Sequence, residues 1–84
     1  MGKTGSKLKR ERQPMPAFVE KALRKSDLFA DYRSRPEYQQ NDYLGWINQA
    51  KKQETKEKRL QQMLEELEKG GVYMKMSHPA SAKQ

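Results

Sequence analysis

The feature that most limits the fold of this 84-residue chain is a short row of apolar residues near its C-terminal end. Four large apolar residues recur there at spacings of three and four: Leu60, Met63, Leu64 and Leu67. That spacing places them on one face of an α-helix, whereas a strand would need every second residue. Gly70 and Gly71 follow, and glycine is the residue most often found just past a helix C-terminus. The pattern therefore predicts an amphipathic helix that ends at these glycines.

Two shorter apolar patterns near the N-terminal end predict two short helices. Pro14 and Pro16 mark the entry to structure, and Pro16 suits the first turn of the first helix, where the N–H group that proline lacks would have no partner. Its apolar side consists of Phe18, Val19, Ala22 and Leu23. For the second helix, Ser26 is the predicted N-cap, and the negative charge of Asp27 suits the first turn. The apolar side of this second helix consists of Leu28, Phe29 and Tyr32.

A further helix is predicted to open at the sequence "SRPE", residues 34–37. Ser34 and Glu37 have the spacing of a capping box. A residue before proline avoids the α conformation, however, so Arg35 is an alternative cap, with Pro36 at the first helical position. The sequence leaves both starts open. The apolar side of this helix consists of Tyr43, Leu44, Trp46, Ile47 and Ala50.

Together these patterns predict an all-α fold, a small single domain of about four helices. Hydrophobic residues make up 33% of the chain and charged residues 35%, so the core must be small. We expect the domain to cover residues 14–76, after a disordered basic tail at 1–13 and before a flexible, disordered tail at 77–84. The sequence "VYMKM" at 72–76 alternates apolar and polar residues, but no second strand is evident. We therefore expect it to fold back on the core as an extended tail.

The net charge of +7 is concentrated in the predicted tails. Residues 1–13 contain five bases and one acid, and residues 72–84 contain two bases and no acid. The remaining residues, 14–71, contain eleven bases and ten acids and are therefore nearly neutral. A domain that binds nucleic acid through its folded surface usually has a larger excess of positive charge.

The sequence contains no pattern typical of a catalytic, cofactor or metal site. There is no cysteine, and His78 is the single histidine, so thiolate chemistry and histidine clusters are excluded. The "GKT" at residues 2–4 lacks the upstream glycine of a phosphate-binding loop. Glu65 and Glu66 are neighbours on a helix and diverge by about 100°, so we expect both to be solvated rather than to act as a pair. Because no pattern of a catalytic site is present, we expect a non-enzymatic protein. No apolar run is long enough to cross a membrane, and no signal peptide is evident, so we expect it in the cytoplasm.

The segment "GWINQAKKQETKEKR" at residues 45–59 joins the two longest predicted helices. We expect Lys51 and Lys52 in the last turn of the earlier helix, where cations meet the negative end of its dipole. Glu54 and Glu57 would occupy the first turn of the later helix, where anions meet the positive end of its dipole. Much of this charge therefore has a structural explanation. Residues 51–59 still carry five bases against two acids, beside the free N–H groups of a helix start, which can bind an anion.

The candidate partner-binding set consists of Trp46, Lys51, Lys52, Lys56, Lys58 and Arg59. The residues allow two interpretations of this set. The corner between the two helices holds an acidic protein or another anionic partner, or it binds nucleic acid together with the basic tail. Glu54 and Glu57 argue against the second interpretation because they would repel phosphates. Contact with an anionic membrane is a third, weaker alternative.

Residues 43–60, "YLGWINQAKKQETKEKRL", resemble the signature of the bacterial YdeI/OmpD-associated family, also called bacteriocin-protection. The resemblance extends over about residues 15–71. It implies an all-helical bacterial domain, and we therefore discount the N-myristoylation pattern at Gly2. Gln53 stands where many members have proline, and only a basic tail precedes the domain where longer members have another domain.

The resemblance implies no enzymatic activity and no cofactor. It implies a link to envelope stress or to tolerance of antimicrobial peptides. We therefore expect a small interaction module that contacts an acidic partner through the corner between the two long helices. The alternative is a nucleic-acid-associated protein that uses the basic tail and residues 51–59. The sequence does not specify the oligomeric state.

Overall fold

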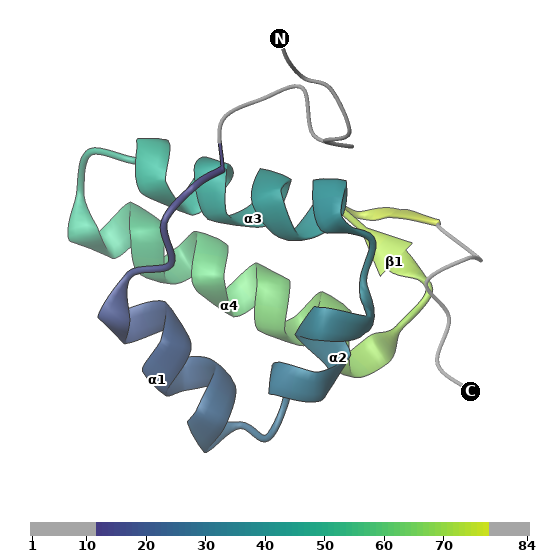
Figure 1. The fold of residues 1–84 in the computed structure, drawn as a ribbon. Coiled ribbons are helices and arrows are strands. Elements are labelled where there is room, and N and C mark those ends of the chain that lie inside the picture. The colour runs from purple at the N-terminus through teal and green to yellow at the C-terminus, as the bar shows by residue number, and fades with distance from the viewer. Residues whose placement is uncertain (1–11, 78–84) are drawn as a thin grey trace, which may run out of the picture.

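Helix α4 (Gln53–Lys69) is the longest element of the computed structural model, which describes residues 12–77, and the other elements pack around it. Helix α3 (Glu37–Gln49) packs along α4, and α2 (Phe29–Ser34) contacts both of them. Helix α1 (Ala17–Lys25) packs against α2, and both short helices lie below α3 in the view of Figure 1. Strands β1 (Val72–Tyr73) and β2 (Met76–Ser77) form a hairpin beyond the C-terminal end of α4. The predicted small, mainly helical domain with four helices is confirmed. Most of the two predicted tails, residues 1–11 and 78–84, lies outside the described residues.

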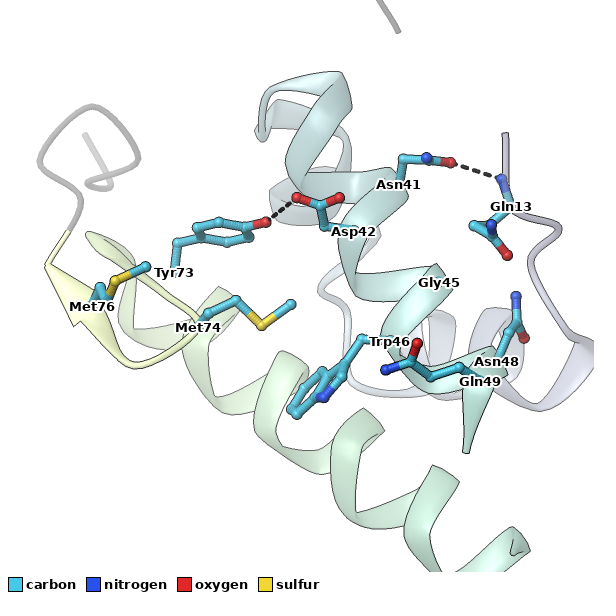
Figure 2. A pocket seen from close by; sticks show the side chains of 10 residues that line it. All are labelled: Gln13, Asn41, Asp42, Gly45, Trp46, Asn48, Gln49, Tyr73, Met74 and Met76. Carbon is cyan, nitrogen blue, oxygen red and sulfur yellow. Dashed lines mark hydrogen bonds between the residues drawn. The ribbon is translucent and has the colours of Figure 1, made fainter. Parts of the chain in front are cut away.

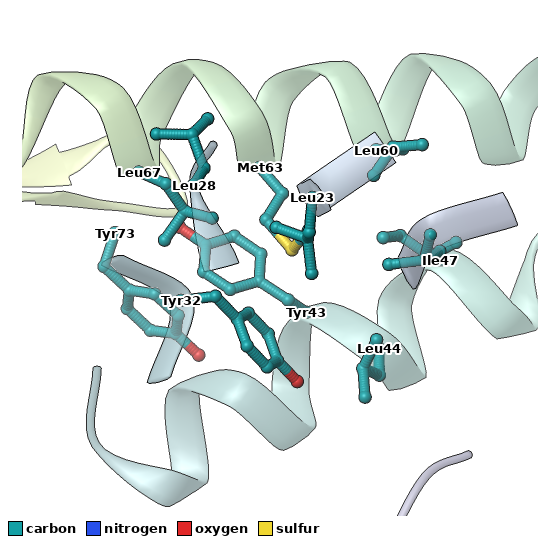
Figure 3. Close-up of a cluster of buried hydrophobic side chains, with 11 residues drawn as sticks. Leu23, Leu28, Tyr32, Tyr43, Leu44, Ile47, Leu60, Met63, Leu67 and Tyr73 are labelled. Atoms are coloured by element: carbon teal, nitrogen blue, oxygen red, sulfur yellow. The ribbon is translucent and has the colours of Figure 1, made fainter. Parts of the chain in front are cut away.

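Apolar side chains from every helix meet in one core between α1, α2, α3 and α4 (Figure 3). The buried members are Val19, Leu23, Leu28, Tyr32, Tyr43, Leu44, Ile47, Leu60, Met63, Leu67 and Tyr73. Nearly all of them belong to the apolar stripes predicted from helical spacing. The hydrophobic periodicity of this short chain therefore identifies its core.

The first turn between helices differs from the prediction. Ser26 ends α1 instead of starting α2, because its hydroxyl donates a hydrogen bond of 2.8 Å to the carbonyl of Ala22, one turn earlier. Asp27 follows in the left-handed region with φ of 61°. Leu28 occupies the N-cap position of α2. The predicted role of Ser26 as an N-cap is therefore wrong, and α2 begins two residues later.

The start of α3 matches neither of the two predicted alternatives. Ser34 is the last residue of α2, and its hydroxyl donates to the carbonyl of Asp31 instead of capping α3. Pro36 is the N-cap residue, and its carbonyl accepts from the N–H groups of Gln39 and Gln40. The capping box is therefore absent, and the alternative with Pro36 inside the helix is wrong by one residue.

The sequence "VYMKM" forms a hairpin rather than the expected single extended tail. Val72 lies opposite Ser77, and Tyr73 lies opposite Met76, in an antiparallel pair. Met74 and Lys75 form the turn with φ values of 51° and 66°, which matches a type I′ turn. Tyr73 is buried in the core, so the expectation that this segment folds back on the core is confirmed. The partner strand that the sequence analysis did not recognise is β2, which is separated from β1 by only the two turn residues.

The carboxylate of Glu66 holds this hairpin against α4. Its Oε1 accepts hydrogen bonds from the Tyr43 hydroxyl and the Met74 N–H, and its Oε2 accepts from the Lys75 N–H and the Gln62 amide. Burial, followed by the bond to this carboxylate, raises the pKa of Tyr43, which keeps the hydroxyl protonated as a donor. Glu66 is only 6% exposed, whereas Glu65 is exposed. The expectation that both carboxylates are solvated is therefore wrong for Glu66.

Arg35 holds the start of the first strand of the hairpin. Its guanidinium donates to the backbone carbonyls of Val72 at 2.8 Å and Glu66 at 2.9 Å, and to the side chain of Gln39 at 3.1 Å. Arg35 and Gln39 are both buried. These bonds join the α2–α3 connection, the end of α4 and the hairpin into one buried polar network, which compensates for placing a charge in the interior.

Candidate functional site

The corner between α3 and α4 opens earlier than the sequence indicates. Helix α3 ends at Gln49, and Ala50 leaves the helical conformation with ψ of 140°. Ala50 is buried and anchors this change of direction to the core. Lys51 and Lys52 therefore lie exposed in the bend and not in the last turn of α3 as predicted. Their positive charges therefore do not serve to stabilise the negative end of the α3 dipole, as the sequence had predicted.

The N-terminus of α4 faces this bend without a capping side chain. Lys52 occupies the N-cap position, where its backbone carbonyl accepts from the N–H of Lys56. Its side chain makes no capping hydrogen bond, so the first N–H groups of α4 have no side-chain acceptor at the cap position. Uncapped N–H groups carry the positive end of the helix dipole. The bend and the helix start together form a positively charged corner.

Trp46 and Arg59 are brought together, but Arg59 turns inward. One Nη of Arg59 donates to the backbone carbonyl of Trp46 at 2.6 Å, and its guanidinium carbon lies 5.3 Å from the centre of the indole ring. Both residues are half-buried, and Trp46 packs against the core. The guanidinium joins α3 to α4 through a charge-assisted hydrogen bond and a cation–π contact. Arg59 is therefore a brace of the corner.

The remaining predicted residues, Lys56 and Lys58, belong to different faces of α4. Residues two positions apart on an α-helix point in directions that differ by about 200°. The ammonium groups of Lys56 and Lys58 therefore cannot contact one site together. Lys56 is half-buried and lies one turn after Lys52, whereas Lys58 is exposed. Glu54 and Lys58 both lie on the outward face of α4. The structure therefore places Lys51, Lys52 and Lys56 at the corner and Lys58 away from it.

An open groove of about 700 Å³ between α3 and the hairpin was not predicted from the sequence (Figure 2). Asp42, Trp46 and Gln49 line it from α3, at spacings of four and three residues. Tyr73, Met74 and Met76 line it from the hairpin. Sequence reasoning missed the groove because one wall is the hairpin, whose second strand was not recognised. The spacing of Asp42, Trp46 and Gln49 was the only available signal.

The Tyr73 hydroxyl closes the inner end of the groove. It donates a hydrogen bond of 2.5 Å to Oδ2 of Asp42, which fixes the hairpin to the middle of α3. Burial and this bond to a carboxylate raise the pKa of Tyr73. The tyrosine therefore stays protonated at neutral pH and serves as a permanent donor.

The extended segment before α1, residues 12–16, forms the third side of the groove and is here called the strap. Its backbone is held by two asparagines of α3: the Gln13 N–H donates to Oδ1 of Asn41 at 2.7 Å, and Asn48 Nδ2 donates to the Pro14 carbonyl at 3.0 Å. Gly45 lies between them, and a Cβ there would come within 3.2 Å of the Gln13 side chain. The face of α3 formed by Asn41, Gly45 and Asn48 thus binds extended backbone.

Two negative observations limit the chemistry within residues 12–77. The structure brings no three His, Cys, Asp or Glu side chains together as a metal-binding group in that range. No helix of the described part has both the length and the apolar character of a transmembrane span.

Comparison with known protein families returns a match over most of the described residues. A family model described as "Bacteriocin-protection, YdeI or OmpD-Associated" matches residues 14–70, about two thirds of the chain. The matched range includes all four helices, the strap from Pro14 onward and the corner between α3 and α4. No curated protein and no solved structure matches the chain.

Proposed function

This chain belongs to the family described as "Bacteriocin-protection, YdeI or OmpD-Associated", and we propose that it is a small non-enzymatic interaction module that binds an acidic protein. The binding site is the corner between α3 and α4. In this proposal the protein acts in the bacterial cytoplasm, and its binding serves protection against bacteriocins or a related envelope stress. The family description supports the physiological part, and the electrostatics of the corner support the partner class.

The exposed position of Lys51 and Lys52 at an uncapped helix start carries the proposal. Lys56, one turn further along, adds a third ammonium group on the same side of α4. Carboxylates of a partner would accept hydrogen bonds from these lysines and from the first N–H groups of α4. The acids of this region, Glu54 and Glu57, are exposed, and Glu57 accepts from the Gln53 amide. Glu54 lies in the first turn of α4 and offsets part of the positive charge, which leaves the three lysines in excess.

Arg59 and Trp46 support the site rather than touch the partner. Because Arg59 bonds the Trp46 carbonyl and covers its ring, the two residues hold the ends of α3 and α4 at a fixed separation. A fixed corner lowers the entropy that must be lost when a partner orders the lysines. Replacement of Arg59 should therefore weaken binding through loss of structure, whereas replacement of the lysines should weaken it through loss of charge.

An acidic protein is favoured over nucleic acid because the positive charge of the corner is local. Residues 14–71 as a whole have an excess of a single positive charge. A nucleic acid would extend past three lysines and meet the carboxylates of α4, which repel phosphates. The nucleic-acid alternative depends on the basic residues before residue 12, which lie outside the described part of the chain.

The proposal is tested by NMR titration of the ¹⁵N-labelled full chain with a capped polyglutamate peptide, followed by inorganic phosphate and a short DNA duplex. We expect the peptide to shift the amide signals of residues 50–56. The triple variant K51A/K52A/K56A should bind the peptide at least about fivefold more weakly, since each exposed ion pair contributes a few tenths of a kcal/mol or more.

The matched control is K58A, which also removes one lysine from α4 but on another face. It should leave affinity for the peptide within about twofold. The same loss of binding free energy per removed charge in the triple variant and in K58A would mean that only net charge matters, and the corner would be rejected as a site. Stronger binding to the duplex than to the peptide, with a steep fall in affinity as salt rises, would favour the nucleic-acid alternative.

A further inference from the structure

A second, smaller cavity of about 140 Å³ lies where the strap, α2 and α3 meet. Its described polar lining comes from these three elements and consists of Arg12, Gln13, Tyr32, Glu37, Gln40 and Asn41. Arg12 and Glu37 are exposed and pair with each other at 3.6 Å, so their charges offset one another. The other polar groups of the lining are a hydroxyl and side-chain amides. The cavity is therefore polar but has no net charge.

The Tyr32 hydroxyl opens into this cavity. Tyr32 is only 5% exposed, and its hydroxyl points away from the Tyr43 ring, on the side of Leu44 (Figure 3). It makes no hydrogen bond to any group of residues 12–77. Burial raises the pKa of Tyr32 to about 12, so at neutral pH the hydroxyl keeps its proton and remains a donor. Because an unpaired buried donor costs free energy, such groups are nearly always bonded to protein or to ordered water.

The size of the cavity favours water over a larger ligand. A volume of about 140 Å³ has room for several water molecules. Pockets that bind organic ligands usually measure about 300 Å³ or more. A polar cavity that is too small for such a ligand, beside a buried hydroxyl that needs a partner, is typical of a site for internal water.

The cavity also offers the further partners that a buried water requires, which number about three. The Nε2 group of Gln40 already donates to the backbone carbonyls of Arg33 and Arg35, so its Oε1 is the atom left to accept a bond. The side chain of Gln13 brings a second amide from the strap. Together with the Tyr32 hydroxyl, these groups supply donors and acceptors from all three elements around the cavity.

We propose that this cavity is a binding site for internal water, which links the Tyr32 hydroxyl to the strap and so fastens the strap to α2. The two direct hydrogen bonds of the strap backbone, described above, both go to α3. Water in the cavity adds the connection to α2. The site is separate from the lysine corner at the start of α4, so the two proposals can fail or succeed independently.

The first experiment is hydrogen exchange of the Gln13 amide in the full chain and in Y32F. The variant removes the hydroxyl but keeps the ring that packs against Phe29. The Gln13 N–H bonds Asn41 only while the strap is seated, so its protection reports on the strap. We expect Y32F to lower this protection about threefold to tenfold, the effect of one hydrogen bond, while amides in the middle of α4 keep theirs. Unchanged or increased protection would overturn the proposal, because the hydroxyl would then have no partner to lose.

The matched control is Y38F, which removes the hydroxyl of a tyrosine that does not line the cavity. The Tyr38 hydroxyl instead accepts a hydrogen bond from the Gln39 amide. Y38F should leave the protection of the Gln13 amide within about twofold. Equal losses in Y32F and Y38F would contradict the proposal, because the effect would not depend on the cavity.

The second experiment tests whether Tyr32 and the strap bond the same water. Q13A removes the side-chain amide of the strap and leaves the backbone N–H of residue 13 as the reporter. We expect the loss of protection in Y32F/Q13A to be smaller than the product of the losses in the two single variants, because either change alone breaks the link. Losses that multiply would overturn the link between Tyr32 and the strap.

A high-resolution crystal structure of the full chain gives the direct observation. We expect a water oxygen within about 3 Å of the Tyr32 hydroxyl. A protein group that bonds the hydroxyl directly, in place of water, would overturn the proposal.

Discussion

Glu66 is the single residue on which most of the described polar network depends. It is a charged side chain in the last turns of α4, yet it is 6% exposed and accepts hydrogen bonds from four donors. Two of these donors are the backbone N–H groups of Met74 and Lys75, in the hairpin turn. A buried carboxylate is tolerated because each oxygen has two partners, and its loss would leave those donors without an acceptor.

We therefore expect E66Q to lower the free energy of unfolding by about 2–3 kcal/mol. The amide keeps the size of the side chain but places an NH₂ group opposite donors that need an acceptor. Urea unfolding followed by circular dichroism measures the change. E65Q is the matched control, because Glu65 is exposed one residue earlier, and it should change stability by less than about 0.5 kcal/mol. Equal effects of the two variants would mean that the buried network contributes nothing.

At the scale of elements, helical spacing predicted the apolar faces well but not the helix ends. Leu60, Met63 and Leu67 lie in the core as expected. The face that a helix buries is fixed by the summed free energy of burying the whole apolar stripe, so no single residue decides it. Helix ends depend on one or two hydrogen bonds, and Ser26 and Ser34 bond carbonyls of the preceding helix where the sequence equally allowed caps of the next.

The hairpin and the groove were missed because their signals are not local. Met74 and Lys75 both adopt positive φ without the Asn-Gly or Asp-Gly residues that usually mark such a turn. Contacts with Glu66, eight and nine residues away, stabilise that conformation instead. Likewise Lys51 and Lys52 were predicted in the last turn of α3 but lie in the bend, because the end of α3 at Gln49 depends on burial of Ala50.

The strap gives the prediction that belongs to this scale. Gly45 stands inside α3, where glycine costs about 1 kcal/mol relative to alanine. A Cβ at this position comes within 3.2 Å of Cγ of the flexible Gln13 side chain, which has to move by a few tenths of an ångström. G45A should therefore raise stability by up to about 1 kcal/mol while the strap adjusts. G45L has no such space and should detach the strap from α3.

Hydrogen exchange of the Gln13 amide distinguishes these two outcomes, since this N–H bonds Asn41 only while the strap is seated. Its protection should persist in G45A and disappear in G45L, while amides in the middle of α4 remain protected in both. Continued protection of Gln13 in G45L would show that the strap does not need a glycine beneath it.

At the scale of the whole molecule, the family match and the folding unit have different ends. The matched range stops at residue 70, before the hairpin begins. Tyr73, however, is part of the core, and Arg35 and Glu66 bond the backbone of residues 72, 74 and 75. The hairpin is therefore an integral part of the domain, because it supplies the partners of two buried charged groups that lie inside the matched range.

We expect a chain that ends at residue 71 to be largely unfolded. A domain of this size has a stability of roughly 3–10 kcal/mol. Loss of the Tyr73 burial costs about 2–3 kcal/mol, and loss of the hydrogen bonds to Arg35 and Glu66 costs a similar sum. A total of about 5 kcal/mol lowers the midpoint of thermal unfolding by about 20 °C or more.

A chain that ends at residue 77 retains every contact described here and should unfold at the midpoint of the full chain. Circular dichroism melting curves of the three chains decide the question: if the shortest melts together with the full chain, the four helices fold without the hairpin, and Glu66 and Arg35 are then satisfied by solvent.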